Sequence, residues 1–236
     1  MAYPTPLSQL PINFDTPFSF HCTLCGACCQ GREDLLLTPF DLSHLSRYLH
    51  KDHEQILQDY CIWYVDERVP VPLVALRMRK RDNACPFLLG RACTVQKAKP
   101  SVCALFPLEC VGMQGGTLRF LPPTTHCGAT APLHTIRSSI KSGPRPDSED
   151  CLRVWHCAIH QITHRMQKLQ KQLLPDLFSQ LQESLFDLLY IDYPEGCDMF
   201  SCFQENVREI NGILDLMEEP RELFPLFACA QGGFSD

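Results

Sequence analysis

The segment C-T-L-C-G-A-C-C places Cys22, Cys25, Cys28 and Cys29 within eight positions, and this crowding constrains the fold more than any other feature. The whole chain holds 15 cysteines in 236 residues, an odd number. Thiols this close together can form disulfides, act as a redox pair or bind a metal. The N-terminal residues lack the basic and apolar regions of a secretory signal, so we expect a cytoplasmic protein. In a reducing compartment, clustered thiols more often bind metal or do redox chemistry than form lasting disulfides.

Composition narrows the class of protein further. The chain is 45% hydrophobic and 20% charged, which is typical of a globular protein rather than a disordered one. Its net charge of -6 argues against a general surface for nucleic acid or anionic membrane. No run of about 18 apolar residues is present, so no segment is expected to span a bilayer. We therefore expect neither nucleic acid nor membrane among its partners.

A second group of cysteines comprises Cys85, Cys93, Cys103, Cys110 and Cys127. Gly90 stands in a short polar step that is expected to turn the chain and bring Cys93 back toward Cys85. Pro100 and Pro107 bracket Cys103 with rigid bends. Turns rich in glycine and proline present thiols as ligands more readily than they bury them in a core. The pattern predicts that thiols from separate loops converge on one inorganic centre.

The spacing of the first group bears on the identity of the metal. C-x2-C-x2-C begins the ferredoxin arrangement, in which a distant Cys followed by Pro supplies a further ligand, and Cys85 is followed by Pro86. Cys29 breaks the ferredoxin spacing, so it is expected to bind a second metal, to act as an exchangeable ligand or to face the interior of the protein. All-thiolate sites suit both zinc and iron–sulfur clusters. The set does not divide into paired C-x2-C knuckles, so we favour a [4Fe–4S] cluster, with zinc as the alternative.

The rest of the chain predicts helices and short strands. Expected helices cover residues 37–50, 52–65, 150–174, 176–190 and 198–219, and expected strands lie within 71–81 and 115–122. The first helix has the clearest start, because Thr38 can cap it, Pro39 suits its first turn, and Asp41 completes a capping box. Cys61, Trp63 and Tyr64 are expected to be buried.

These elements predict an α+β protein with four parts. An N-terminal arm (1–20) precedes a small cysteine-rich metal-binding domain with short strands and two helices (21–140). A linker rich in Pro, Gly and Ser (141–150) then leads to a helical bundle (151–236).

The cysteine motifs resemble a known family. C-T-L-C-G-A-C-C, followed by C-P-F-L-L-G-R-A-C-T-V-Q-K-A-K-P-S-V-C-A-L-F-P, is similar to the YkgJ-like CxxCxxCC family, which is associated with chelation of zinc or iron. The likeness covers about residues 20–128. Carried over position by position, it implies a metal site made of Cys22, Cys25, Cys28, Cys29, Cys85, Cys93 and Cys103, with Cys127 as an eighth member.

Three positions depart from the family pattern. Gln96 stands where the family has Tyr, and Lys99 and Ala104 stand where it has Arg. Lys99 keeps the positive charge but loses the planar fork of a guanidinium. The cysteines themselves are kept, so the resemblance implies metal binding more firmly than any contact made by the arginines.

We therefore predict a cytosolic protein that holds an iron–sulfur cluster, or zinc, and serves in redox chemistry or metal handling. Two alternatives stay open. A more distant likeness to the flagellin lysine N-methylase implies a cluster-containing enzyme that modifies a protein, although no Gly-rich loop for S-adenosylmethionine is recognisable. A spare thiol such as Cys29 could instead make the chain a redox sensor. Enzymatic activity and a protein partner are left undecided by the sequence.

Overall fold

The computed structural model describes residues 11–20, 22–32, 35–115, 117–121, 132–142 and 148–218. Its helices are α1 (Pro39–Leu49), α2 (His53–Tyr60), α3 (Ser101–Ala104), α4 (Ile136–Ser142), α5 (Ser148–Leu169), α6 (Pro175–Phe186) and α7 (Met199–Glu218). Its strands are β1 (Pro17–Phe18), β2 (Leu36–Leu37), β3 (Cys61–Tyr64), β4 (Leu73–Leu76), β5 (Leu88–Leu89), β6 (Ala92–Cys93), β7 (Glu109–Gln114), β8 (Thr117–Leu121) and β9 (His134–Thr135). The mixture of helices and small sheets confirms the α+β class.

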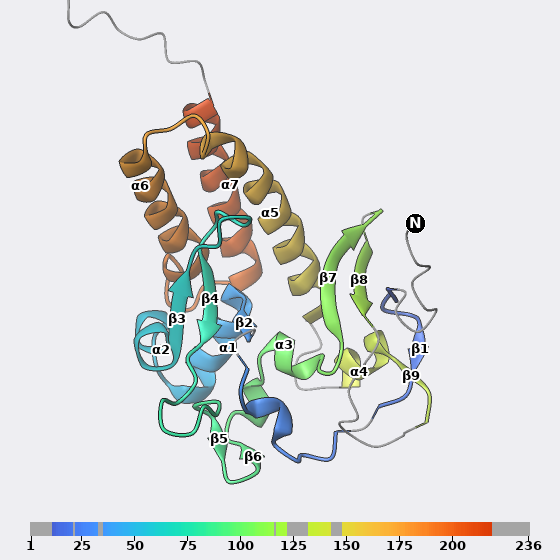
Figure 1. Ribbon diagram of the computed structural model, residues 1–236. Coiled ribbons are helices and arrows are strands. Elements are labelled where there is room, and N and C mark those ends of the chain that lie inside the picture. The colour runs from blue at the N-terminus through green and yellow to red at the C-terminus, as the bar shows by residue number, and fades with distance from the viewer. Residues whose placement is uncertain are drawn as a thin grey trace, which may run out of the picture.

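The main hydrophobic core lies under the antiparallel sheet β2-β4-β3 and the helices α1, α2, α5, α6 and α7 (Figure 1). Leu42, Val74 and Cys85 contribute to it from the first half of the chain, and Trp155 and Tyr190 from the second half. The cysteine-rich segment and the helices therefore share one continuous core.

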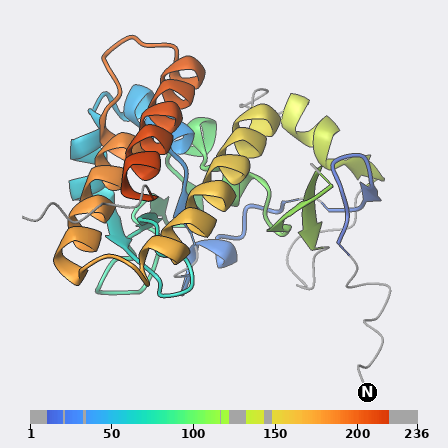
Figure 2. The same ribbon diagram turned by 90° about the horizontal axis from the view of Figure 1, so that it is seen from above.

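A smaller core lies beside the first, beneath the hairpin β7–β8. Both views show this hairpin, α4, β1 and β9 on one side of the molecule and the helices α6 and α7 on the other (Figures 1 and 2). Phe14, Phe120, Ile136 and Leu152 belong to the smaller core. Because Leu152 and Trp155 both come from α5, that helix packs on both cores and joins them.

The start of α1 agrees with the prediction, and the end of α2 does not. Thr38 and Asp41 form the expected reciprocal capping box. The helix expected over 52–65 ends at Tyr60, and Cys61–Tyr64 form strand β3, paired with β4. Aromatic and β-branched side chains favour a strand once a partner is present, and this partner is distant in sequence. Cys61 is buried as predicted, whereas Trp63 is 48% exposed and Tyr64 is also exposed, so their predicted burial is wrong.

Three long helices follow, as the sequence predicts, with shifted ends. The first begins at Ser148 and ends at Leu169, and the second runs into a π-helical turn, Asp187–Ile191. Within this turn the Tyr190 side chain is fully buried and its hydroxyl donates a hydrogen bond to the Pro72 carbonyl (3.2 Å). In the part of the chain that the structure describes, no helix combines the length and apolar character needed to span a bilayer.

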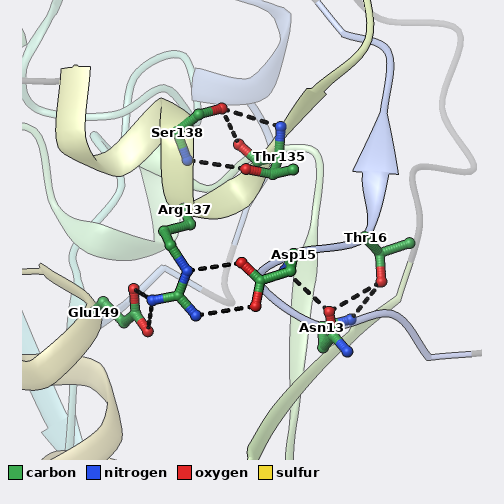
Figure 3. A network of polar contacts seen from close by, with 7 residues as sticks. All are labelled: Asn13, Asp15, Thr16, Thr135, Arg137, Ser138 and Glu149. Atoms are coloured by element: carbon green, nitrogen blue, oxygen red, sulfur yellow. Dashed lines mark hydrogen bonds and ion pairs between the residues drawn. The ribbon is translucent and has the colours of Figure 1, made fainter.

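An arginine-centred network attaches the N-terminal segment to α4 and α5 (Figure 3). Arg137 donates two hydrogen bonds to Asp15 (2.7 and 3.1 Å) and pairs with Glu149. Its guanidinium also lies over the Phe14 ring, 5.7 Å from the centroid. Hydrogen bonds to both carboxylates hold the pKa of Arg137 above its ordinary value. The network therefore closes the smaller core from outside.

Replacing Arg137 with Met should loosen this attachment. We expect a loss of about 1–2 kcal/mol, since a bridging, partly buried guanidinium is worth more than an isolated surface ion pair. Hydrogen exchange at the paired amides of Ile12 and Phe120 should accelerate, while exchange in α1 stays slow. Arg153→Met is the control, because within the described residues the ion pair of Arg153 is with exposed Asp150 on its own helix. Equal acceleration in both variants would contradict the role given to Arg137.

Candidate metal centre

The first cysteine loop is shaped by a left-handed turn. Gly26 has φ of 76°, a conformation that favours glycine, and it precedes the 3₁₀ turn Ala27–Cys29. The Cys29 N–H donates to the Gly26 carbonyl (3.1 Å) and closes that turn. Leu24 also has a positive φ of 52°, so the chain bends twice within the motif. These bends allow cysteines three residues apart to face the same space.

Backbone hydrogen bonds join the two cysteine groups directly. The Cys85 N–H donates to the Cys29 carbonyl (2.7 Å), and the Gly31 N–H donates to the Asn83 carbonyl (2.8 Å). An antiparallel bridge between Gln30 and Ala84 lies between these two bonds. Thus Cys29 and Cys85 occupy adjacent positions on paired chain segments, although 56 residues separate them in sequence.

A hairpin brings Cys93 to the same place. Strands β5 and β6 pair antiparallel with Leu88 opposite Cys93, and Gly90 (φ 62°) lies in the turn. The predicted return of Cys93 toward Cys85 is confirmed by this pairing.

Asp41 holds the segment that carries Cys103. Its fully buried carboxylate accepts hydrogen bonds from the backbone N–H and hydroxyl of Ser101 (2.8 and 2.7 Å), at the start of α3. The other carboxylate oxygen accepts from the backbone N–H and hydroxyl of Thr38, both at 2.9 Å. One side chain therefore fixes the starts of α1 and α3. The sequence predicted only its capping box with Thr38.

The cysteines surround two adjoining cavities. The smaller cavity has a volume of about 20 Å³, and the cysteines that line it are Cys28, Cys29, Cys85, Cys93 and Cys103. The larger cavity has a volume of about 220 Å³, and the cysteines that line it are Cys22, Cys25, Cys28, Cys29 and Cys93. Each of the seven predicted site cysteines within the described residues lines at least one cavity, and three of them line both. The eighth, Cys127, lies outside the described residues.

The other described cysteines lie outside both cavities. Cys61 and Cys151 are buried in the main core, and Cys110 packs against the smaller core. The Cys157 thiol donates to the sulfur of Met113 (3.3 Å). Cys197 and Cys202 flank the start of α7. The lining of these two cavities thus separates the seven from the other described thiols.

The donor set suits a thiophilic metal. The Sγ atoms of Cys28 and Cys29 are 4.0 Å apart. Two thiolates on one tetrahedral zinc, with Zn–S of about 2.3 Å, lie about 3.8 Å apart. Within the described ranges, no three His, Cys, Asp or Glu side chains are grouped closely enough to hold one ion as they stand. Coordination therefore requires thiols to rotate toward a common point in the cavity, as occurs where metal binding completes a site.

Positive charge surrounds these thiols. Lys99 lines both cavities, Arg32 lines the smaller one and Arg91 the larger one. The Arg32 guanidinium also lies over the Phe106 ring, 5.4 Å from its centroid. No Asp or Glu is among the described lining residues. The surroundings therefore favour bound negative charge, either thiolates or an anion.

The thiols at the site differ in acidity because their hydrogen bonds, burial and neighbouring charges differ. A hydrogen bond with Cys29, assisted by the charges of Lys99 and Arg32, lowers the pKa of Cys28 to about 6 despite partial burial. The same contact with Cys28, together with burial, raises the pKa of Cys29 well above its usual range. Burial also raises the pKa of Cys85, and that of Cys103 to about 12. At neutral pH the thiolate form of Cys28 is favoured, whereas Cys29, Cys85 and Cys103 would lose protons when a metal binds.

Several residues that line the cavities were not predicted from the sequence. Arg32 and Arg91 are missed, although each stands within three residues of a motif cysteine. Phe18 and Phe20 line the larger cavity from a segment that read only as an extended arm. The cysteines stand out in the sequence because their spacing is regular, whereas these neighbours follow no pattern.

Comparison with known families identifies the segment. Residues 21–128 match the model of the CxxCxxCC family, described as a "putative zinc- or iron-chelating domain". This segment is similar to the CxxCxxCC domain over its whole length. No curated protein and no solved structure matched the chain. The family supports zinc or iron chelation as the function of the domain. The matched segment contains all seven cysteines around the cavities, whereas Phe18, Phe20, His134, Ile136 and Ser139 complete the larger cavity from outside that segment.

Proposed function

We propose that this protein binds one zinc or iron ion in the smaller cavity, with Cys28, Cys29, Cys85 and Cys103 as ligands. The observation that carries the proposal is the convergence of these four thiols, from three separate segments, on one small cavity. A volume of about 20 Å³ has room for a body the size of one water molecule. An ion fits this space, and the match of residues 21–128 to the CxxCxxCC family model supports zinc or iron as its identity.

The charges of the surrounding residues support the same assignment. Four thiolates around a divalent ion carry a net charge of -2, which is costly to bury without compensation. Lys99 and Arg32 line this cavity and supply two positive charges. A bound ion would supply structural cross-linking of the three segments and, if it is iron, one-electron redox chemistry.

An iron–sulfur cluster is the second candidate, because the C-x2-C-x2-C spacing favours it. A four-iron cube exceeds the smaller cavity, so a cluster would occupy the larger one. Cys22, Cys25, Cys28 and Cys93 line that cavity together, which gives a cube four thiol donors. The two candidates share Cys28 but otherwise use different cysteines, and they differ in content of inorganic sulfide.

Metal analysis of anaerobically purified protein tests the proposal. We expect about one zinc or iron per chain, no inorganic sulfide, and a strong dependence of metal retention on reduced thiols. Iron and sulfide in equal amounts, with broad visible absorption, would transfer the assignment to the cluster in the larger cavity. Absence of zinc and iron after reconstitution with either metal would exclude both candidates.

A further inference from the structure

The larger cavity extends well beyond the cysteines. Its other wall is apolar and is formed by Phe18, Phe20, Leu105, Phe106, Leu108 and Ile136. Cavities that bind small organic molecules are mostly apolar, with a few convergent polar groups. A volume of about 220 Å³ is below the 300–1,000 Å³ typical for drug-sized ligands, so an occupant must be small.

The polar groups that face this cavity are cationic or neutral. Lys99 is half-buried, Arg91 is exposed, and Gln96 lies between them in the sequence. In the described part of the chain, the side chains of Arg91 and Lys99 have no hydrogen-bond or ion-pair partner, although the charge of Lys99 also acts on Cys28. The described lining includes no carboxylate. Two cations that form no ion pair within the described residues, beside an aromatic wall, complement an anion with an apolar body.

Stabilisation of the thiolates accounts for the positive charge of Lys99 but not for that of Arg91. Lys99 and Arg32 act on Cys28, whereas Arg91 is not among the charges that shift its pKa. Arg91 lines the larger cavity and not the smaller one, so it faces a space separate from the proposed ion. Its charge is therefore available to a second ligand.

We propose that the larger cavity binds a small organic carboxylate with an aromatic or branched apolar body. Arg91 and Lys99 hold the carboxylate, and the phenylalanine and leucine side chains enclose the body. Because Cys28, Cys29 and Cys93 line both cavities, the bound molecule lies directly against the thiols of the smaller cavity. The proposal places a ligand next to the metal centre and does not require the metal to be present.

Three probes that share a phenylpropyl skeleton and differ in their terminal polar group test this assignment. 3-Phenylpropionate, 3-phenylpropanol and 3-phenylpropylamine are titrated into the full chain as purified, with binding followed by calorimetry and ligand-observed NMR. We expect the carboxylate to bind about tenfold more tightly than the alcohol, and the amine to show no measurable binding. Equal binding of all three, or binding of none, would overturn the proposal.

Two variants locate the binding. Arg91→Gln should weaken carboxylate binding about tenfold and leave the alcohol unaffected, whereas Lys97→Gln should change neither, because Lys97 does not line the cavity. Ser139→Trp places a large side chain at an exposed position of the cavity lining and should block both probes. Unchanged binding in Arg91→Gln would place the ligand elsewhere and refute the site.

Metal content is measured on the same samples to separate this inference from the proposed function. Normal metal with no preference for the carboxylate refutes the cavity ligand alone. Charge-selective binding without zinc or iron refutes the metal proposal alone. If Ser139→Trp fails to fold, the three-probe comparison on the unmodified chain and the Arg91→Gln result decide the matter.

Discussion

Substitution of Asp41 with Ala is expected to lower the free energy of unfolding by about 3–5 kcal/mol, because it leaves several buried donors without an acceptor. The carboxylate accepts four hydrogen bonds from Thr38 and Ser101, and no part of the residue is exposed. Ser101 stands two residues before Cys103, so the variant should also bind metal more weakly. Urea denaturation and zinc titration of the purified variant measure the two effects.

Asp52→Ala is the matched control for this prediction. Asp52 also belongs to a capping box, at the start of α2, and its side chain accepts from the Gln55 N–H (2.7 Å). It is exposed and makes no bridge to the cysteine segments, so its loss should cost about 1 kcal/mol and leave metal affinity unchanged. If both variants lose the same stability and the same affinity, Asp41 has no special role at the site.

Replacing Cys103 with Ser is expected to lower zinc affinity on the order of 100-fold or more, because one thiolate ligand is lost from a closed set. The stabilisation that zinc gives to the folded chain should fall in parallel, since a ligand that binds only the native state stabilises it through its affinity. Competition with a chromophoric chelator under reducing conditions gives the affinity, and thermal unfolding with and without zinc gives the stabilisation.

Two further serine variants sharpen the result. Cys202→Ser changes a thiol outside both cavities and should leave zinc affinity unchanged. Cys22→Ser removes a thiol that lines only the larger cavity, so zinc should be retained. A loss of metal in Cys22→Ser as great as that in Cys103→Ser would contradict a single ion in the smaller cavity and favour a cluster.

The sequence predicts the fold best where the signal is local. The start of α1 follows from Thr38, Pro39 and Asp41, which act on one another within a single turn. The end of α2 could not be predicted in the same way. Residues 61–64 can continue a helical pattern, and they become β3 because β4, nine to fifteen residues further on, offers a partner. Strand pairing at a distance overrides local preference.

The same distinction between local patterns and distant contacts applies to the candidate site. Thiol spacing allowed the cysteines to be proposed from the sequence, and the turn at Gly90 allowed the position of Cys93 to be anticipated. The link between Asp41 and Ser101 joins residues 60 apart and leaves no mark on either local pattern. Likewise, the apolar wall of the larger cavity draws on Phe18 and Ile136, which meet only in the folded chain.

The main-chain bonds between Cys29 and Cys85, and between Gly31 and Asn83, have a consequence for the proposed metal site. They hold two of the proposed donor segments together through the backbone, so this contact does not depend on the thiol side chains. Thiolates select poorly among thiophilic metals, and availability then governs occupancy. Under the proposed function, the supply of zinc or iron in the cell would therefore decide which of the two metals the protein carries.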